Sequence, residues 1–146
     1  IPDAARALDV ALEVRYGDIL GINERRHAGV TVRGTWEHHY FRRWGQTLVG
    51  ATHGHTLKPD AMARLLAEER PEDWGRSKRR YFMFGHVHHD SARRIGSVRV
   101  ESFSAPSARS TFEAAAGYQT ARSMTAVVYH ATMGEIARYT VPLPIA

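Results

Sequence analysis

Two apolar segments of this chain each run into a group of histidines around a glycine, and a helical pattern lies between them. The segments are LVGATHGHTL, residues 48–57, and YFMFGHVHHD, residues 81–90. Short apolar runs bounded by glycine are typical of buried strands. A strand–helix–strand order in one sheet implies a parallel crossover, which is right-handed by default. This pattern restricts the chain to an α/β fold with a mixed sheet, since hairpin signals surround the crossover.

The helix between the two strands is the clearest periodic segment. KPDAMARLLAEER begins at Pro59, which presets φ for a first turn, and ends before Pro71. Its buried stripe is predicted as Ala61, Met62, Leu65 and Leu66. The other expected elements are a helix from Pro2 to Gly17, an extended region 30–52 turning at Gly45, a strand 80–84, and hairpins turning at Gly96 and Gly134. Residues 71–79 are expected to be a loop, and a short helix is expected around 112–116.

Composition limits the classes of protein that the chain can belong to. Its 146 residues, 43% of them hydrophobic, fit one domain spanning residues 1–146. No apolar run is long enough to span a bilayer and no secretory segment is present, so a cytoplasmic location without membrane contact is expected. The absence of cysteine excludes disulfides and thiolate zinc sites. Any metal site must therefore use His, Asp, Glu or Asn.

The basic charge is almost entirely arginine. The formal net charge is +5 and the sequence pI is about 10.0. Arginine suits bidentate contacts with phosphate, whereas a coding bias toward arginine would explain the same composition. The densest basic segment, RSKRR at 76–80, is read as a solvated loop, with a phosphate or nucleic-acid contact as the alternative.

The histidines that follow the two strands are candidate metal ligands. Parallel strands end at the same edge of a sheet, so His53 and His86 are expected to converge there. In GHVH the two histidines are two residues apart, so His86 and His88 can face one metal or two adjacent ones. Three imidazoles suit an open catalytic site that acidifies water. The spacing of His27, His38, His39 and His130 implies no coordination. His89 and Asp90 are read as an exposed loop, or as groups that orient a ligand.

These motifs resemble those of the calcineurin-like metallophosphoesterases, especially their small bacterial and phage members. GHVH resembles the GHxH motif of that superfamily, THGH resembles the preceding histidine motif, and VRVESFSAPSAR with GEIARYTV resembles the closing strands. The resemblance is best over residues 47–141. It implies a four-layer αββα sandwich in which a dinuclear divalent metal centre (Mn, Zn or Fe), bridged by an aspartate and a hydroxide, hydrolyses a phosphate ester.

The same resemblance implies roles for individual histidines. His53 and His86 would bind one metal and His88 the other. His55 would contact phosphate or donate a proton to the leaving group, or it packs in the loop without a chemical role. The implied substrate is a phosphomonoester or phosphodiester, and the basic charge adds nucleic acid as a candidate substrate.

The chain departs from the superfamily at its amino-terminal end. The motifs DxH, GDxxD and GNH[DE] are absent, and Gly21 stands where an aspartate is expected three residues after Asp18. The chain is therefore expected to be the carboxy-terminal portion of a metallophosphoesterase domain, offering about half of a dinuclear site. An amino-terminal half of the same domain, or another copy of the chain, is the expected partner.

Three functions are consistent with these residues. The first is a metal-dependent phosphoesterase. The second is an arginine-rich nucleic-acid-binding module with structural histidines, which would bind in a salt-sensitive way and ignore chelators. The third is a phosphoesterase-fold scaffold without catalytic activity. Manganese dependence that is lost in His53→Ala and His86→Ala separates the first from the others.

Overall fold

The computed structural model describes residues 37–87, 89–104, 106 and 122–143. By its internal contacts the chain divides into two units, residues 1–37 and 38–146, and every described residue except Glu37 belongs to the second. The predicted opening helix, the extended residues 30–36, the short helix near 112–116, His27 and His88 lie outside the described residues. Within the described part of the chain, no helix has the length and apolarity needed to cross a membrane.

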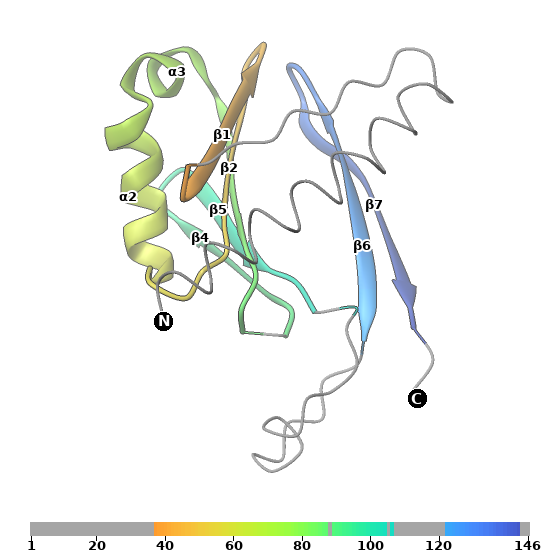
Figure 1. Ribbon diagram of the computed structural model, residues 1–146. Coiled ribbons are helices and arrows are strands. Elements are labelled where there is room, and N and C mark those ends of the chain that lie inside the picture. Colours follow the sequence, from red (N-terminus) through yellow and green to blue (C-terminus); the bar gives the residue numbers. More distant parts are fainter. Residues whose placement is uncertain (1–36, 88, 105, 107–121, 144–146) are drawn as a thin grey trace, which may run out of the picture. The chain divides into compact units, whose positions relative to one another are not determined.

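A five-stranded mixed sheet is the centre of the described structure (Figure 1). The strand order is β1-β2-β3-β5-β4, in which β2, β3 and β5 run parallel and both edge strands pair antiparallel. The predicted α/β class with a mixed sheet is confirmed, and so are the parallel crossover and the turns at Gly45 and Gly96. The strands are β1 (His39–Trp44), β2 (Thr47–Thr52), β3 (Arg79–Phe84), β4 (Ser91–Ile95) and β5 (Val98–Ser102).

Helix α2 (Pro59–Glu69) forms where the periodic pattern predicts it. Proline occupies its first turn and Asp60 complements the helix dipole there. Met62 and Leu66 are fully buried as predicted, but the third buried position is Ala63, while Ala61 and Leu65 are half-buried. The buried face of α2 is therefore rotated slightly about the helix axis from the predicted one.

The predicted loop after Pro71 is wrong, because residues Pro71–Arg76 form a second helix, α3. Pro71 starts it, Glu72 and Asp73 lie in its first turn, and Arg76 lies in its last turn, an arrangement that favours a helix dipole. Arg80 supports the helix end, since its guanidinium lies 4.0 Å from the Trp74 ring centroid and donates to the Trp74 carbonyl at 2.8 Å. Arg80 therefore has a structural role rather than a place in a solvated basic loop.

Successive side chains of β3 point alternately to two different layers of the structure. Phe82 and Phe84 belong to the buried cluster that includes Met62 and Leu66 of α2. The neighbouring side chains of β3 point the other way, as successive strand residues must. Among them, Tyr81 lies 4.6 Å, ring centroid to ring centroid, from Tyr129 of the closing hairpin. Helices therefore cover one face of the sheet and the hairpin contacts the other.

The closing hairpin is a separate two-stranded sheet made of β6 (Ser123–His130) and β7 (Gly134–Pro142). The hairpin is confirmed, with Gly134, at φ +81°, at the start of β7. Several hydrogen bonds attach its turn to the large sheet. The Tyr81 hydroxyl accepts from the Glu135 amide at 2.8 Å, and the Thr47 hydroxyl donates to the His130 carbonyl at 2.7 Å. The described residues thus form a helix layer and two sheet layers.

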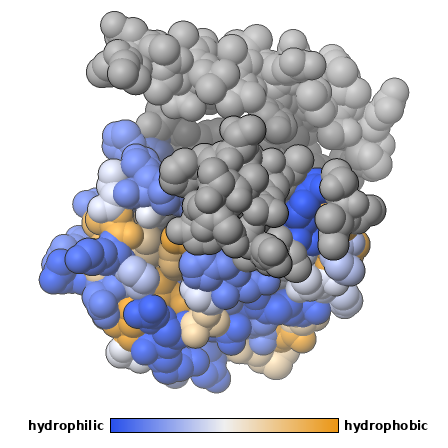
Figure 2. All heavy atoms as spheres, turned by 90° about the horizontal axis from the view of Figure 1, so that it is seen from below, coloured by the Kyte–Doolittle hydropathy of each residue, from blue (hydrophilic) through white to orange (hydrophobic). Residues whose placement is uncertain are grey.

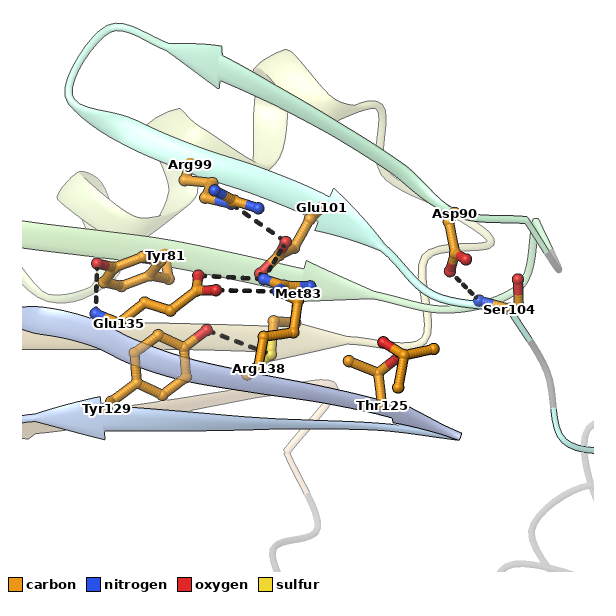
Figure 3. A network of polar contacts seen from close by, with 11 residues as sticks. Tyr81, Met83, Asp90, Arg99, Glu101, Ser104, Thr125, Tyr129, Glu135 and Arg138 are labelled. Atoms are coloured by element: carbon orange, nitrogen blue, oxygen red, sulfur yellow. Dashed lines mark hydrogen bonds and ion pairs between the residues drawn. The ribbon is translucent and has the colours of Figure 1, made fainter. Parts of the chain in front are cut away.

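An ionic network joins the two sheets (Figure 3). The Glu101 carboxylate, on β5, is almost fully buried and accepts from Arg138 of β7 through both oxygens, at 3.0 and 2.8 Å. Arg138 also donates to Glu135 at 2.9 Å, and Arg99 donates to Glu101 at 3.2 Å. A buried carboxylate with two arginine partners is fully compensated, so the two layers are held in a specific register.

The described surface combines hydrophilic and apolar areas. On the side seen in Figure 2, the described surface is mostly hydrophilic with smaller hydrophobic areas between. Large exposed apolar side chains concentrate on the hairpin, where they share the face that points away from the Tyr129 side: Met124, Val128, Tyr139 and Val141.

Candidate histidine site at the strand ends

The ends of β2 and β3 lie side by side and carry the two histidine segments. Thr52 is the parallel partner of Phe84, so the residues that follow each strand begin at the same edge of the sheet. The Gly85 amide donates to the His53 carbonyl at 3.1 Å, which extends the pairing one step beyond the strands. The predicted convergence of His53 and His86 at this edge therefore has its backbone basis in the sheet register.

Three imidazoles gather at this edge. The ring centroids of His53 and His86 are 5.2 Å apart, those of His53 and His55 are 5.3 Å apart, and those of His55 and His86 are 6.1 Å apart. All three side chains belong to exposed residues. The cluster is thus open to a ligand from solvent, and it includes His55, whose place in the site the sequence left open.

His86 has a backbone conformation that is unusual for a residue with a side chain. Its φ is +66°, and no other non-glycine residue of the described ranges has a positive φ. The Val87 amide donates to the Gly85 carbonyl at 2.8 Å, which closes a tight three-residue turn around His86. A left-handed conformation costs an L-residue about 1–2 kcal/mol, and such strain concentrates at functional sites. The turn places the His86 ring close to those of His53 and His55.

Glycine is required between His53 and His55. Gly54 has a φ of +98°, and a Cβ atom at this position would lie 2.9 Å from Cδ2 of Phe84 and 3.2 Å from the Gly85 carbonyl oxygen. Both the dihedral and the space exclude a side chain. The sharp turn that brings two imidazoles to the same edge therefore depends on this glycine.

Hydrogen bonds fasten the loop that carries His86 and the residues after it. Asp90 accepts from the Ser104 amide at 2.7 Å, and Ser102 donates from its hydroxyl to the His89 carbonyl at 2.7 Å (Figure 3 shows the first). The His89 ring lies 2.9 Å from the Val87 carbonyl. Both His89 and Asp90 are exposed residues of this loop, in agreement with the first of the two sequence readings, and whether they orient a ligand stays a prediction.

Two histidines for which the sequence implied no ligand role have structural contacts. Nδ1 of His39 lies 3.1 Å from the Thr52 hydroxyl, beside the end of β2. Nδ1 of His130 accepts from the amides of Thr132 and Met133 at 3.2 and 3.3 Å, and so supports the hairpin turn. The contact of His39 could be found only from the β1–β2 register, which pairs His39 with Thr52.

The donor chemistry at this edge suits a divalent transition metal, because neutral imidazole is its commonest nitrogen ligand. In the described part of the chain, however, no group of three His, Cys, Asp or Glu side chains is arranged to hold a metal ion. His88, one of the three predicted ligands, lies outside the described residues. The assignment of His53, His86 and His88 as ligands therefore stays a prediction.

A cavity of about 740 Å³ opens beside the imidazoles, between the two sheets. His53 and His86 lie at its rim, and Met83, Phe103 and Val127 are among the apolar residues that line it. Burial is the main reason why the pKa of the Tyr129 phenol, which also lines the cavity, lies well above its ordinary value. The sequence gave no signal for this cavity, since its residues come from four separate segments.

Comparisons with known proteins find structural likeness at low sequence identity. No family model matches the chain, and no curated protein matches it in a sequence search. The chain is similar to the crystal structure of a single mutant of Vps29 from Entamoeba histolytica. The TM-score is 0.47 with 16% sequence identity, and the alignment covers 81% of this chain and 67% of that one. At this distance, the assignment of the site depends on the residues of the chain itself.

Proposed function

We propose that this chain carries part of the active site of a metal-dependent phosphoesterase. The observation that supports the proposal most strongly is the convergence of His53, His55 and His86 at the shared end of two parallel strands, with His86 in a strained conformation. Such convergence brings neutral nitrogen donors from two segments of the chain to one exposed position. The order and spacing of the histidine motifs, as read from the sequence, agree with this chemistry.

The histidines have distinct roles in this proposal. His53 and His86, with His88, hold divalent metal, which when bound supplies Lewis-acid activation of water and neutralises charge on the phosphate. His55 lies next to both rings but in the loop before α2, so it contacts the phosphate or donates a proton to the leaving oxygen. Asp90 keeps the loop after β3 in place through Ser104.

The test combines metal binding with hydrolysis. Purified protein is titrated with Mn²⁺ by calorimetry, and hydrolysis of p-nitrophenyl phosphate and bis-p-nitrophenyl phosphate is followed with and without EDTA. His53→Ala and His86→Ala are expected to weaken Mn²⁺ binding at least about tenfold, since loss of even an outer partner of a ligand costs 10–100-fold. His130→Ala is the matched control, because its imidazole serves the hairpin turn, and it should bind Mn²⁺ like the wild type.

Two results would reject the proposal. The first is Mn²⁺ binding that His53→Ala and His86→Ala leave unchanged. The second is nucleic-acid binding that is salt-sensitive and indifferent to EDTA, with no metal bound, which would support the arginine-rich binding module instead. Several arginines weigh against that module, because they already have structural partners: Arg43 with Asp73, Arg80 with Trp74, and Arg99 and Arg138 with Glu101.

A further inference from the structure

The cavity beside the imidazoles has a lining that is distinct from the histidine cluster itself. It lies between the ends of β2 and β3 on one side and the inward face of β6 on the other. Its volume, about 740 Å³, falls within the range of pockets that enclose small organic ligands. Its apolar part includes Ala51, Met83, Phe84, Phe103, Pro106 and Val127.

Among the described residues that line this cavity there is no Asp, Glu, Lys or Arg. Apart from the imidazoles of His53 and His86, the polar side chains of the described lining carry hydroxyls, among them those of Thr125 and Tyr129. The Tyr129 hydroxyl donates to the Met83 sulfur at 3.9 Å. A charged ligand group would lose its hydration here without gaining a partner, so the cavity selects a neutral group.

The rim of the cavity, in contrast, favours an anionic group. His53 and His86 line the same cavity at its open edge, so a phosphate held by the imidazoles would have its ester substituent directed to the apolar lining. Aromatic and thioether side chains such as Phe103 and Met83 interact well with flat rings, through edge contacts and sulfur contacts.

We infer that the natural substrate is a phosphate ester whose alcohol portion carries a neutral aromatic ring, bound in the cavity between β3 and β6 while its phosphate meets the histidines. This inference rests on the proposed function for the phosphate part and on the cavity for the ring part. Binding of the ring is independent of hydrolysis, so it can be measured with analogues that the protein cannot cleave.

The experiment compares phenylphosphonate with methylphosphonate in the presence of Mn²⁺ by calorimetry. Both carry the anionic group, and only the first carries a ring. Phenylphosphonate is expected to bind at least about tenfold more tightly, because the ring leaves water for an apolar lining. In the wild type, the Met83 methyl resonance is expected to shift with phenylphosphonate and not with methylphosphonate, a readout that needs no variant.

Neighbouring positions on β6 offer a matched pair of variants. Val127 lines the cavity, whereas Val128 is 41% exposed and points to the other face of the hairpin. Val127→Trp should fill the cavity and abolish the preference for phenylphosphonate, with methylphosphonate binding unchanged. Val128→Trp, of the same added size, should leave the preference intact. Unfolding midpoints of both variants confirm that they are folded.

The outcomes separate the two proposals. Equal binding of the two phosphonates by the wild type would overturn the aromatic assignment and leave the phosphoesterase proposal standing. If neither phosphonate binds, the phosphoesterase proposal fails. Binding of benzyl alcohol, which carries a ring and no phosphonate group, then tests the cavity by itself. Benzyl alcohol binding that Val127→Trp removes would support an aromatic pocket, and its absence would overturn the inference.

Discussion

His86 combines an unusual backbone conformation with a place in the candidate histidine site. The φ of His86 is +66°, a conformation that glycine adopts readily and histidine adopts rarely. Gly85 stands directly before it in the sequence, yet the positive φ falls on the histidine. The strain is maintained by the surrounding contacts, including the hydrogen bond across the turn from Val87 to Gly85. Backbone strain of this kind concentrates at functional sites, so it supports His86 as a candidate site residue.

The strain at His86 predicts an order of stability between two variants that both lack the imidazole. His86→Gly should be more stable than His86→Ala by about 1 kcal/mol, because glycine adopts positive φ without the clash that alanine meets. Urea unfolding of the two variants measures the difference. Both variants should lose Mn²⁺ binding equally. An alanine variant as stable as the glycine variant would show that the turn relaxes and stores no strain.

Among the strands and helices, the packing of α2 on the sheet depends on a glycine in the middle of β2. A Cβ atom at Gly50 would lie 2.6 Å from Cδ2 of Phe82 and 3.1 Å from Cδ1 of Leu66. Both neighbours are completely buried, so neither side chain can yield easily. Gly50 therefore allows the helix and the neighbouring strand to approach closely, which in turn positions the loop that follows β2.

Gly50→Ala is expected to lower the free energy of unfolding by about 1–3 kcal/mol, the usual effect of overpacking a core. Gly75→Ala is the matched control in helix α3, since a Cβ atom there would meet nothing within 4 Å. That control should raise stability by up to about 1 kcal/mol through helix propensity. Chemical denaturation of both variants gives the comparison, and a neutral Gly50→Ala would mean that Phe82 can move aside.

Across the molecule, the two sheets are joined by charges rather than by apolar packing alone. Arg138 bridges Glu101 of the large sheet and Glu135 of its own strand. A hydrogen bond from Arg138 is the main reason why the pKa of Glu135 lies below its ordinary value of 4.5. The network therefore links β5 of the large sheet to β7 of the hairpin.

The network predicts how stability depends on pH. A carboxylate with a lowered pKa stabilises the folded state above its unfolded pKa, and the contribution is lost as the pH falls through the folded value. Glu135→Gln should therefore cost about 1 kcal/mol at pH 7. The difference from the wild type should shrink below pH 4.5.

Urea unfolding between pH 3 and pH 7 measures this difference. Glu68→Gln is the control, since Glu68 is 64% exposed in a 3.7 Å pair with Arg64 on the surface of α2 and should show almost no effect. A Glu135→Gln difference that stays constant down to pH 3 would contradict the assigned role of the Arg138 contact.

Much of the fold could be predicted from local patterns. The strands before His53 and His86, the helix between them and the turns at Gly45, Gly96 and Gly134 were found at or within one or two residues of their places. Hydrophobic periodicity, and the glycine or proline residues that end an element, depend on a few neighbouring residues. Both can therefore be read from the linear sequence. Helix α3 was missed because six residues give too little periodicity to separate a helix from a polar loop.

The linear sequence therefore determined which segments become strands and helices, and which histidines follow them, because these depend on near neighbours. Only the tertiary structure decided that His55 joins His53 and His86, that Glu101 meets Arg138, and that a neutral cavity opens beside the imidazoles. Those contacts join residues as far apart in the chain as Ala51 and Tyr129. They arise from strand register and from the layering of two sheets, which no short stretch of sequence encodes.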